Sequence, residues 1–165
     1  MAEKEELIKE KIEHSGLFDF PSFYSFAFSW FKDEDLGVIE KRYVEKVNGN
    51  KREITIEWEA AKELSDYFKQ QFGVKFKIEF TDVEVEVNGK KEKMNQGKIS
   101  VEIKGVMIRD HKNKWEKSAF SRFMRDFYNK FVIPGRVDQI KNKIKKDVQD
   151  FKEEIKAFLA LMGRR

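Results

Sequence analysis

The last thirty or so residues constrain the fold more than any other part of the chain, because their apolar side chains recur at every third or fourth position. Such spacing places these side chains on one stripe of a single long amphipathic helix. A helix of this kind must bury its stripe against the chain's own sheet, a second copy of the chain or a membrane surface. The stripe that we predict to carry interactions consists of Ile140, Ile144, Val148, Phe151 and Ile155.

Composition indicates one folded domain. The chain has 165 residues, of which 40% are hydrophobic and 14% aromatic, so it can form a core and is unlike a disordered protein. Lysine and glutamate dominate the 39% of charged residues, a balance found in heat-adapted proteins. Because cysteine is absent, disulfides, thiolate nucleophiles and cysteine-based metal sites are excluded. The chain therefore suits a reducing cytosol.

No targeting or membrane segment is apparent. The first residues are acidic, whereas a signal peptide begins with basic residues and an apolar run. The longest apolar segment, residues 18–31, contains Asp19 and three serines and is shorter than the ~20 residues that a membrane-spanning helix needs. We therefore expect a soluble, cytoplasmic protein without a transmembrane segment.

Two Asn-Gly dipeptides, at residues 48–49 and 88–89, predict two β-hairpins. The first hairpin joins strands at residues 38–47 and 52–58. In the second, apolar residues alternate from residue 74 and return on a partner strand that ends near residue 108. The alternation changes phase at residues 81–82, which predicts a β-bulge there. The tip of this hairpin has few apolar residues, so we expect it to project beyond the core.

Helical patterns lie on both sides of these hairpins. Residues 3–14 have apolar residues at helical spacing, which predicts a charged N-terminal helical arm at residues 1–16. Residues 21–33 favour a helix, although a strand also fits the pattern. Residues 60–72 favour a helix capped by Gly73, with one long strand from about residue 64 as the alternative. Residues 114–163 predict a pair of helices separated by Pro134 and Gly135.

These elements define the expected fold class. Antiparallel hairpins flanked by helices indicate an α+β fold rather than an alternating parallel one. We predict an antiparallel sheet of about four strands within residues 38–108, packed against helices and including a long C-terminal amphipathic helix. Residues 17–165 would form this single domain.

Charge is uneven along the chain and gives one functional hypothesis. Residues 1–108 contain 18 basic and 22 acidic residues, whereas residues 109–146 contain 12 basic and 4 acidic residues. Such a basic region attracts polyanions, so backbone-directed binding of nucleic acid is one interpretation. The alternative is that these lysines only keep two helices soluble. The candidate contacts are Arg122, Arg125, Lys141, Lys143, Lys145 and Lys146.

Catalytic and metal-binding patterns are weak. The only histidines, His14 and His111, lie far apart in polar segments. A single adjacent pair such as Asp110-His111 is common by chance, and the acidic run at residues 33–35 does not continue any known cation-binding spacing. We therefore expect no catalytic, cofactor or metal site, and a protein that is not an enzyme.

An apolar ligand is a further alternative. A curved antiparallel sheet closed by a long C-terminal helix resembles the arrangement of helix-grip lipid carriers, which would imply an apolar cavity. A phenylalanine-rich helix is otherwise simply part of a core. The residues that would line the cavity are Phe23, Phe26, Trp30, Phe76 and Ile78.

The sequence thus favours a non-enzymatic binding or assembly module that acts through its C-terminal helices. Its partner would be another protein or a second copy of the chain. Nucleic-acid binding through residues 109–146 and carriage of an apolar ligand are the two alternatives.

Overall fold

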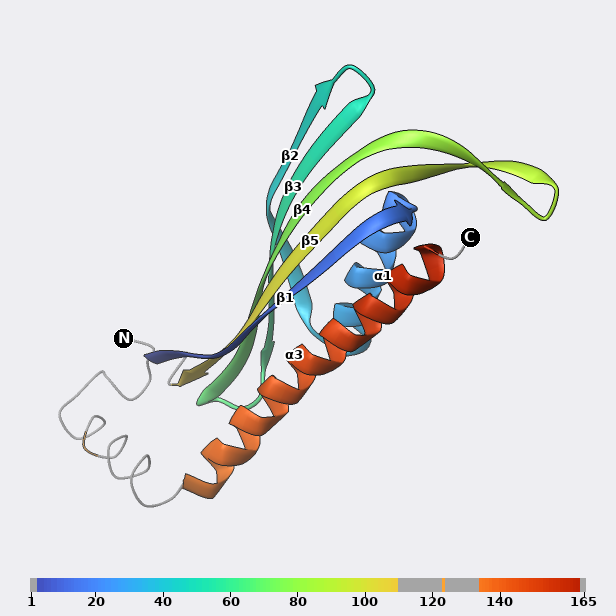
Figure 1. Ribbon diagram of the computed structural model, residues 1–165. Coiled ribbons are helices and arrows are strands. Elements are labelled where there is room, and N and C mark those ends of the chain that lie inside the picture. The colour runs from blue at the N-terminus through green and yellow to red at the C-terminus, as the bar shows by residue number, and fades with distance from the viewer. Residues whose placement is uncertain (1–2, 110–122, 124–133, 164–165) are drawn as a thin grey trace.

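The described part of the chain folds into a curved, five-stranded antiparallel sheet with two helices on its concave face (Figure 1). A computed structural model describes residues 3–109, 123 and 134–163. The strand order is β1-β5-β4-β3-β2. In chain order the elements are β1 (Glu3–Phe18), α1 (Phe20–Asp33), β2 (Gly37–Asn48), β3 (Lys51–Glu63), β4 (Phe68–Val87), β5 (Lys90–Arg109) and α3 (Pro134–Gly163).

The α+β class is confirmed, but the sheet has five strands rather than about four. The additional strand is β1, which occupies the segment predicted to be a helical arm, so that prediction is wrong. β1 pairs with β5 from Glu3 to Phe18 and is interrupted only by a register shift between Glu6 and Ile8. This irregularity changes which residues face the core, and Leu7, Ile8 and Ile12 consequently mimic helical spacing.

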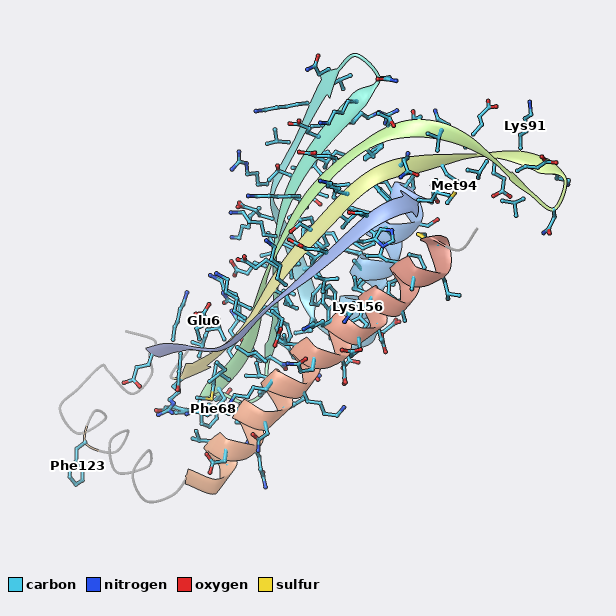
Figure 2. All side chains as sticks on the ribbon, in the orientation of Figure 1. Glu6, Phe68, Lys91, Met94, Phe123 and Lys156 are labelled. Atoms are coloured by element: carbon cyan, nitrogen blue, oxygen red, sulfur yellow. The ribbon has the colours of Figure 1, made fainter. Side chains whose placement is uncertain are left out.

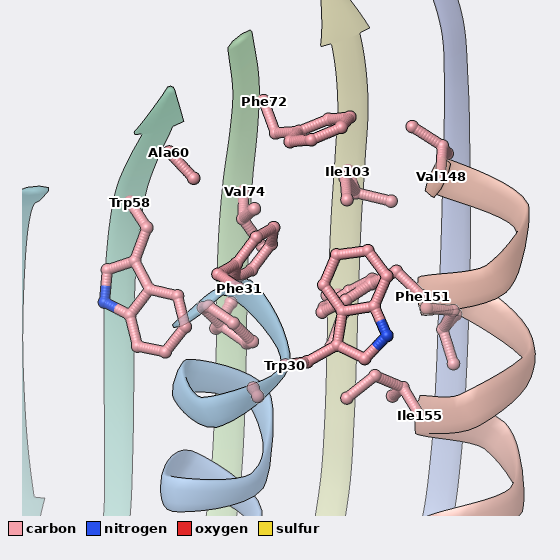
Figure 3. Packing of buried hydrophobic residues seen from close by; sticks show 14 of the residues in the cluster. Trp30, Phe31, Trp58, Ala60, Phe72, Val74, Ile103, Val148, Phe151 and Ile155 are labelled. Atoms are coloured by element: carbon pink, nitrogen blue, oxygen red, sulfur yellow. The ribbon is translucent and has the colours of Figure 1, made fainter. Parts of the chain in front are cut away.

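Helix α1 confirms the favoured prediction of a helix at residues 21–33. Pro21 lies in the first turn, where its missing amide hydrogen costs nothing. The buried face consists of Phe23, Ala27, Trp30 and Phe31. The helix ends near Glu34, whose amide donates to the carbonyl of Trp30 at 3.2 Å. This helix fills the concave side of the sheet between β3 and α3 (Figure 3).

Residues 60–72 do not form a helix, so that prediction is wrong. The alternative of one long strand from about residue 64 is nearer to the structure, because β4 runs without a break from residue 68 to residue 87. β3 continues to Glu63 and β4 begins at Phe68, with a tight turn between them. The Ser65 hydroxyl accepts hydrogen bonds from the amides of Tyr67 and Phe68 at 3.2 and 3.0 Å. A serine that bonds the backbone two and three residues ahead stabilises a turn in place of a helix.

Both predicted hairpins are present. The first turns at Gly49 and Asn50, one residue later than predicted, and the second turns at Asn88 and Gly89, which both have positive φ angles. The β4–β5 register is continuous from residue 68 to residue 87, so no β-bulge exists at residues 81–82.

Strand twist, rather than a bulge, explains the change of phase in β4. A β-carbon on Gly97 would lie 1.9 Å from the carbonyl oxygen of Glu79 and 2.7 Å from Cα of Phe80, so only glycine permits this close approach of the two strands. Past this point the hairpin extends beyond β1 and curls over the end of α3 (Figure 1). Its twist turns the face that carries Val83 and Met94 toward that helix end.

Helix α3 packs on the sheet mainly against β1 and, to a smaller extent, against β5. Its buried residues recur from Val137 to Met162, so the predicted long amphipathic helix is confirmed. Gly105 on β5 allows close packing, because an added β-carbon would lie 2.7 Å from Cγ2 of Ile144 and 3.0 Å from Cγ2 of Val148. Among the described helices, none is long and apolar enough to cross a membrane.

We expect Gly105→Val to lower the free energy of unfolding by about 1–3 kcal/mol, because the larger side chain would push α3 away from the sheet. Chemical denaturation measures this loss. Gly135→Ala is the matched control, since no atom lies within 4 Å of a β-carbon at that helical position. It should be neutral or stabilise the protein by about 0.5–1 kcal/mol. A similar stability for wild type and Gly105→Val would contradict the close packing of α3 on β5.

Candidate functional site

The predicted interaction stripe of α3 lies inside the domain. Ile140 is 8% exposed, and the other four members, Ile144, Val148, Phe151 and Ile155, are fully buried. Figure 3 shows Val148, Phe151 and Ile155 directed toward the sheet and α1. The chain's own core therefore occupies the stripe in this fold, and a partner would have to contact other parts of α3.

The basic candidates are largely engaged within the chain. Lys141 donates to Glu5 at 3.1 Å, and Lys146 donates to Asp150 at 2.8 Å. Lys145 is exposed and forms no ion pair within residues 3–109, 123 and 134–163. Arg122 and Arg125 lie outside the described residues. The sequence cluster is thus not a set of free cations on the part of α3 that is described.

Lys143, the remaining basic candidate, belongs to a polar contact between α3 and β4. Its ammonium group donates to Asp147 at 2.8 Å and to the side-chain oxygen of Gln70 at 3.2 Å. The Gln70 amide nitrogen in turn donates to Asp147 at 2.6 Å. Gln70 is fully buried and Asp147 is 8% exposed, so each side chain satisfies the other. This network fixes the position of the helix on the sheet.

The residues predicted to line an apolar cavity instead pack against other aromatic rings. The ring centroids of Phe23 and Phe76 are 5.9 Å apart, and those of Phe26 and Phe158 are 4.2 Å apart. The ring centroids of Trp30 and Phe151, both labelled in Figure 3, are 5.2 Å apart. These distances are typical of core packing. Ile78, the fifth predicted lining residue, is 1% exposed.

A groove does exist at the C-terminal end of α3, beneath the β4–β5 hairpin. Its volume is about 470 Å³. Figure 2 shows Met94 on the side of the hairpin that faces this helix end. Leu161, which lines the groove beside other apolar side chains, is 64% exposed. The lining residues are Asp19, Ser22, Glu92, Lys93, Met94, Phe158, Leu161 and Met162.

A polar cluster holds the hairpin above this groove. Asp82 accepts hydrogen bonds from Asn95 at 2.9 Å and Arg52 at 3.0 Å, and its ion pair with Lys93 is 3.2 Å long. Asn95 is buried, and its side-chain oxygen accepts the backbone amide of Phe20 at 2.8 Å. The cluster thereby ties β3, β4 and β5 to the first turn of α1. Sequence spacing gave no signal for it, because its members come from four separate segments.

Only some of the weak catalytic and metal candidates lie within the described residues. The His14 ring bonds the carbonyl of Leu17 at 3.2 Å, while Asp110 and His111 lie outside the described residues. No family model and no curated protein matches the chain. Within the described residues, no group of three or more His, Asp or Glu side chains could hold a metal ion. The groove is therefore the feature from which function can be argued.

A second polar contact joins α1 to the edge strand β2. The Tyr24 hydroxyl donates to Glu40 at 2.5 Å, and the indole nitrogen of Trp58 donates to the same carboxylate oxygen at 2.9 Å. Burial, followed by the bond to the Glu40 carboxylate, raises the pKa of Tyr24 to about 12. Glu40 lies at the register shift of β2, so this contact holds an irregular part of the strand.

We expect the tyrosine to make folding sensitive to alkaline pH. Because its pKa is near 10 in the unfolded chain and about 12 in the folded one, the folded state retains the proton longer. The stability that the protonated Tyr24 hydroxyl contributes to the folded state is complete below pH 10 and is lost as the pH rises toward 12. As the pH is raised from 9 toward 12, Tm should fall less for Tyr24→Phe than for wild type. Identical pH profiles would contradict the raised pKa.

Two aspartates on α3 allow a matched test of the buried network. Asp147→Ala should lower the free energy of unfolding by about 1–3 kcal/mol, because it leaves the buried Gln70 amide without its acceptor. Asp150 also pairs with a lysine four positions away, but this pair lies at the surface. Asp150→Ala should therefore lower the free energy of unfolding much less than Asp147→Ala does. Equal losses in urea denaturation would show that burial does not distinguish the two contacts.

Proposed function

We propose that this protein is a non-enzymatic binding module that takes an apolar ligand into the groove at the C-terminal end of α3. The observation that carries the proposal is the 64% exposure of Leu161 at the mouth of a groove of about 470 Å³. Leu161 shares this groove with Met94, Phe158 and Met162. The proposal keeps the C-terminal helix as the binding element but assigns binding to its end rather than to its buried stripe.

The size and chemistry of the groove support a small ligand. Sites for small molecules have volumes of about 300–1,000 Å³ and combine mainly apolar walls with a few polar groups. Here four apolar side chains meet polar groups contributed by α1 and β5. Two of the four are methionines, whose flexible side chains adapt to ligands of different shape. An intact folded partner would contact a much larger surface than this groove offers.

The alternatives receive less support from the described residues. Lys141, Lys143 and Lys146 are paired with carboxylates, which weakens a polyanion site on α3. A cavity in the centre of the domain would require the aromatic rings to separate, and they are in contact. Enzymatic activity would need converging catalytic groups, and the groove offers two carboxylates and one lysine without a histidine.

The proposal is tested with the neutral dye N-phenylnaphthylamine, whose fluorescence rises in apolar surroundings. We expect wild type to bind the dye and Leu161→Gln to bind it about tenfold more weakly, because part of the apolar wall is lost. Tm of each variant confirms folding, which should be unaffected at so exposed a position.

Val47→Gln is the control for surface apolarity. Val47 is 67% exposed, close to the 64% of Leu161, but it lies on β2 and does not line the groove. Its replacement should leave dye binding unchanged. Absence of dye binding to wild type, or equal weakening by both substitutions, would show that the groove is not the binding site.

A further inference from the structure

A second, smaller groove adjoins the groove at the end of α3. The smaller groove has a volume of about 200 Å³ and shares Asp19 and Lys93 with the larger one. Its remaining lining residues are Phe20, Pro21, Arg52, Phe80, Asp82 and Asn95. The two grooves thus adjoin at Asp19 and Lys93, and the smaller one, lined by charged and amide groups of β3, β4 and β5, is the polar half of this pair.

Most hydrogen-bond acceptors in the polar half are already engaged. One oxygen of Asp82 accepts from Asn95 at 2.9 Å, and the other accepts from Arg52 at 3.0 Å and contacts Lys93 at 3.2 Å. The side-chain oxygen of Asn95 accepts the amide of Phe20. The Ser22 hydroxyl donates to Asp19. A ligand that donates hydrogen bonds to Asp82 or Asn95 would therefore compete with contacts that hold the fold together.

Donors, in contrast, remain available. An ammonium group has three N–H bonds and a guanidinium group has five. Lys93 directs one contact to Asp82 and its side chain is 69% exposed. Arg52 also donates to Asp82, its side chain is 40% exposed, and its ion pair with Glu45 is 3.9 Å long, which exceeds hydrogen-bond distance. Both groups can bond a further acceptor without losing Asp82.

Net charge alone would not select an anion here. The combined grooves contain three carboxylates, from Asp19, Asp82 and Glu92, and two cations, from Arg52 and Lys93. Asp82 is however bound directly to both cations, so their attraction for it is already satisfied. Selection then depends on the unused directional donors, which are both charged. Hydrogen bonds from charged donors to a carboxylate are roughly twice as strong as bonds between neutral groups.

We propose that the ligand is an alkyl carboxylate whose chain lies against Met94, Phe158, Leu161 and Met162 while its carboxylate accepts hydrogen bonds from Lys93 and Arg52. This inference rests on the proposed function and specifies the ligand for the same groove. It places the apolar end of the ligand in the larger groove and the carboxylate at the smaller one. Asp19 and Lys93, which line both grooves, lie at the junction.

The test compares decanoate, decanol and decylamine as competitors of N-phenylnaphthylamine at neutral pH. The three share one alkyl chain and differ at the polar end. We expect decanoate to displace the dye at about a tenfold lower concentration than decanol, because of its charged hydrogen bonds. Decylamine should displace it no better than decanol.

Substitutions identify the donor. Lys93→Gln should remove most of the advantage of decanoate over decanol. A distorted groove would instead weaken decanoate and decanol alike and leave their ratio unchanged. Lys91→Gln is the control, since Lys91 lies two residues away on the same strand and lines neither groove. It should preserve the order of the three competitors.

The outcomes separate the two proposals. If the dye binds but the competitors displace it equally, or decylamine displaces it best, the carboxylate inference is wrong and the apolar groove stands. If Lys93→Gln and Lys91→Gln behave alike, Lys93 does not recognise the ligand and the inference is wrong. If wild type does not bind the dye, both proposals are wrong.

Discussion

The burial of one apolar stripe of α3 against β1 and β5 is the contact on which the rest of the fold depends. A 30-residue helix with charged residues on its outer side gains stability mainly from such tertiary packing. The contact is close because Gly105 places no side chain between the β5 backbone and the helix. The full stripe therefore stays in contact with the sheet, and α1 occupies the remaining concave surface. The end of α3 is consequently fixed beneath the β4–β5 hairpin.

The groove follows from two further constraints on that hairpin. Close approach of the strands at Gly97 lets β4 and β5 curl past the end of β1, and Asp82 ties them to α1 through Asn95. The curled strands bring Met94 opposite the last turn of α3. Leu161 faces this space without being covered, whereas the neighbouring Met162 is buried. An apolar surface that remains exposed after the core is complete is the feature that suggests binding.

Local sequence patterns predicted the elements that depend on local chemistry. The spacing in α1 and α3 and the Asn-Gly turn at residues 88–89 sufficed, because a helix face and a tight turn are each encoded within a few residues. β1 escaped prediction because its register shift near Leu7 disguised the alternation. Residues 60–72 were misjudged because the turn at Ser65 interrupts two strands whose apolar residues remain in step. The groove could not be predicted, since its walls come from residues 19–22, 92–94 and 158–162.

The basic region of the sequence shows why charge along a chain differs from charge in space. Lysines on α3 suggested a polyanion site, yet the strand beside them is the acidic β1. Lys141 reaches Glu5 and Lys152 reaches Glu10, with N–O distances of 3.1 and 3.0 Å. The bonds from Lys152 and Gln149 lower the pKa of Glu10, as expected for a carboxylate that is stabilised in its charged form. Within the described residues, lysines of α3 are thus paired with carboxylates from the other end of the sequence, and the apolar groove becomes the more informative surface.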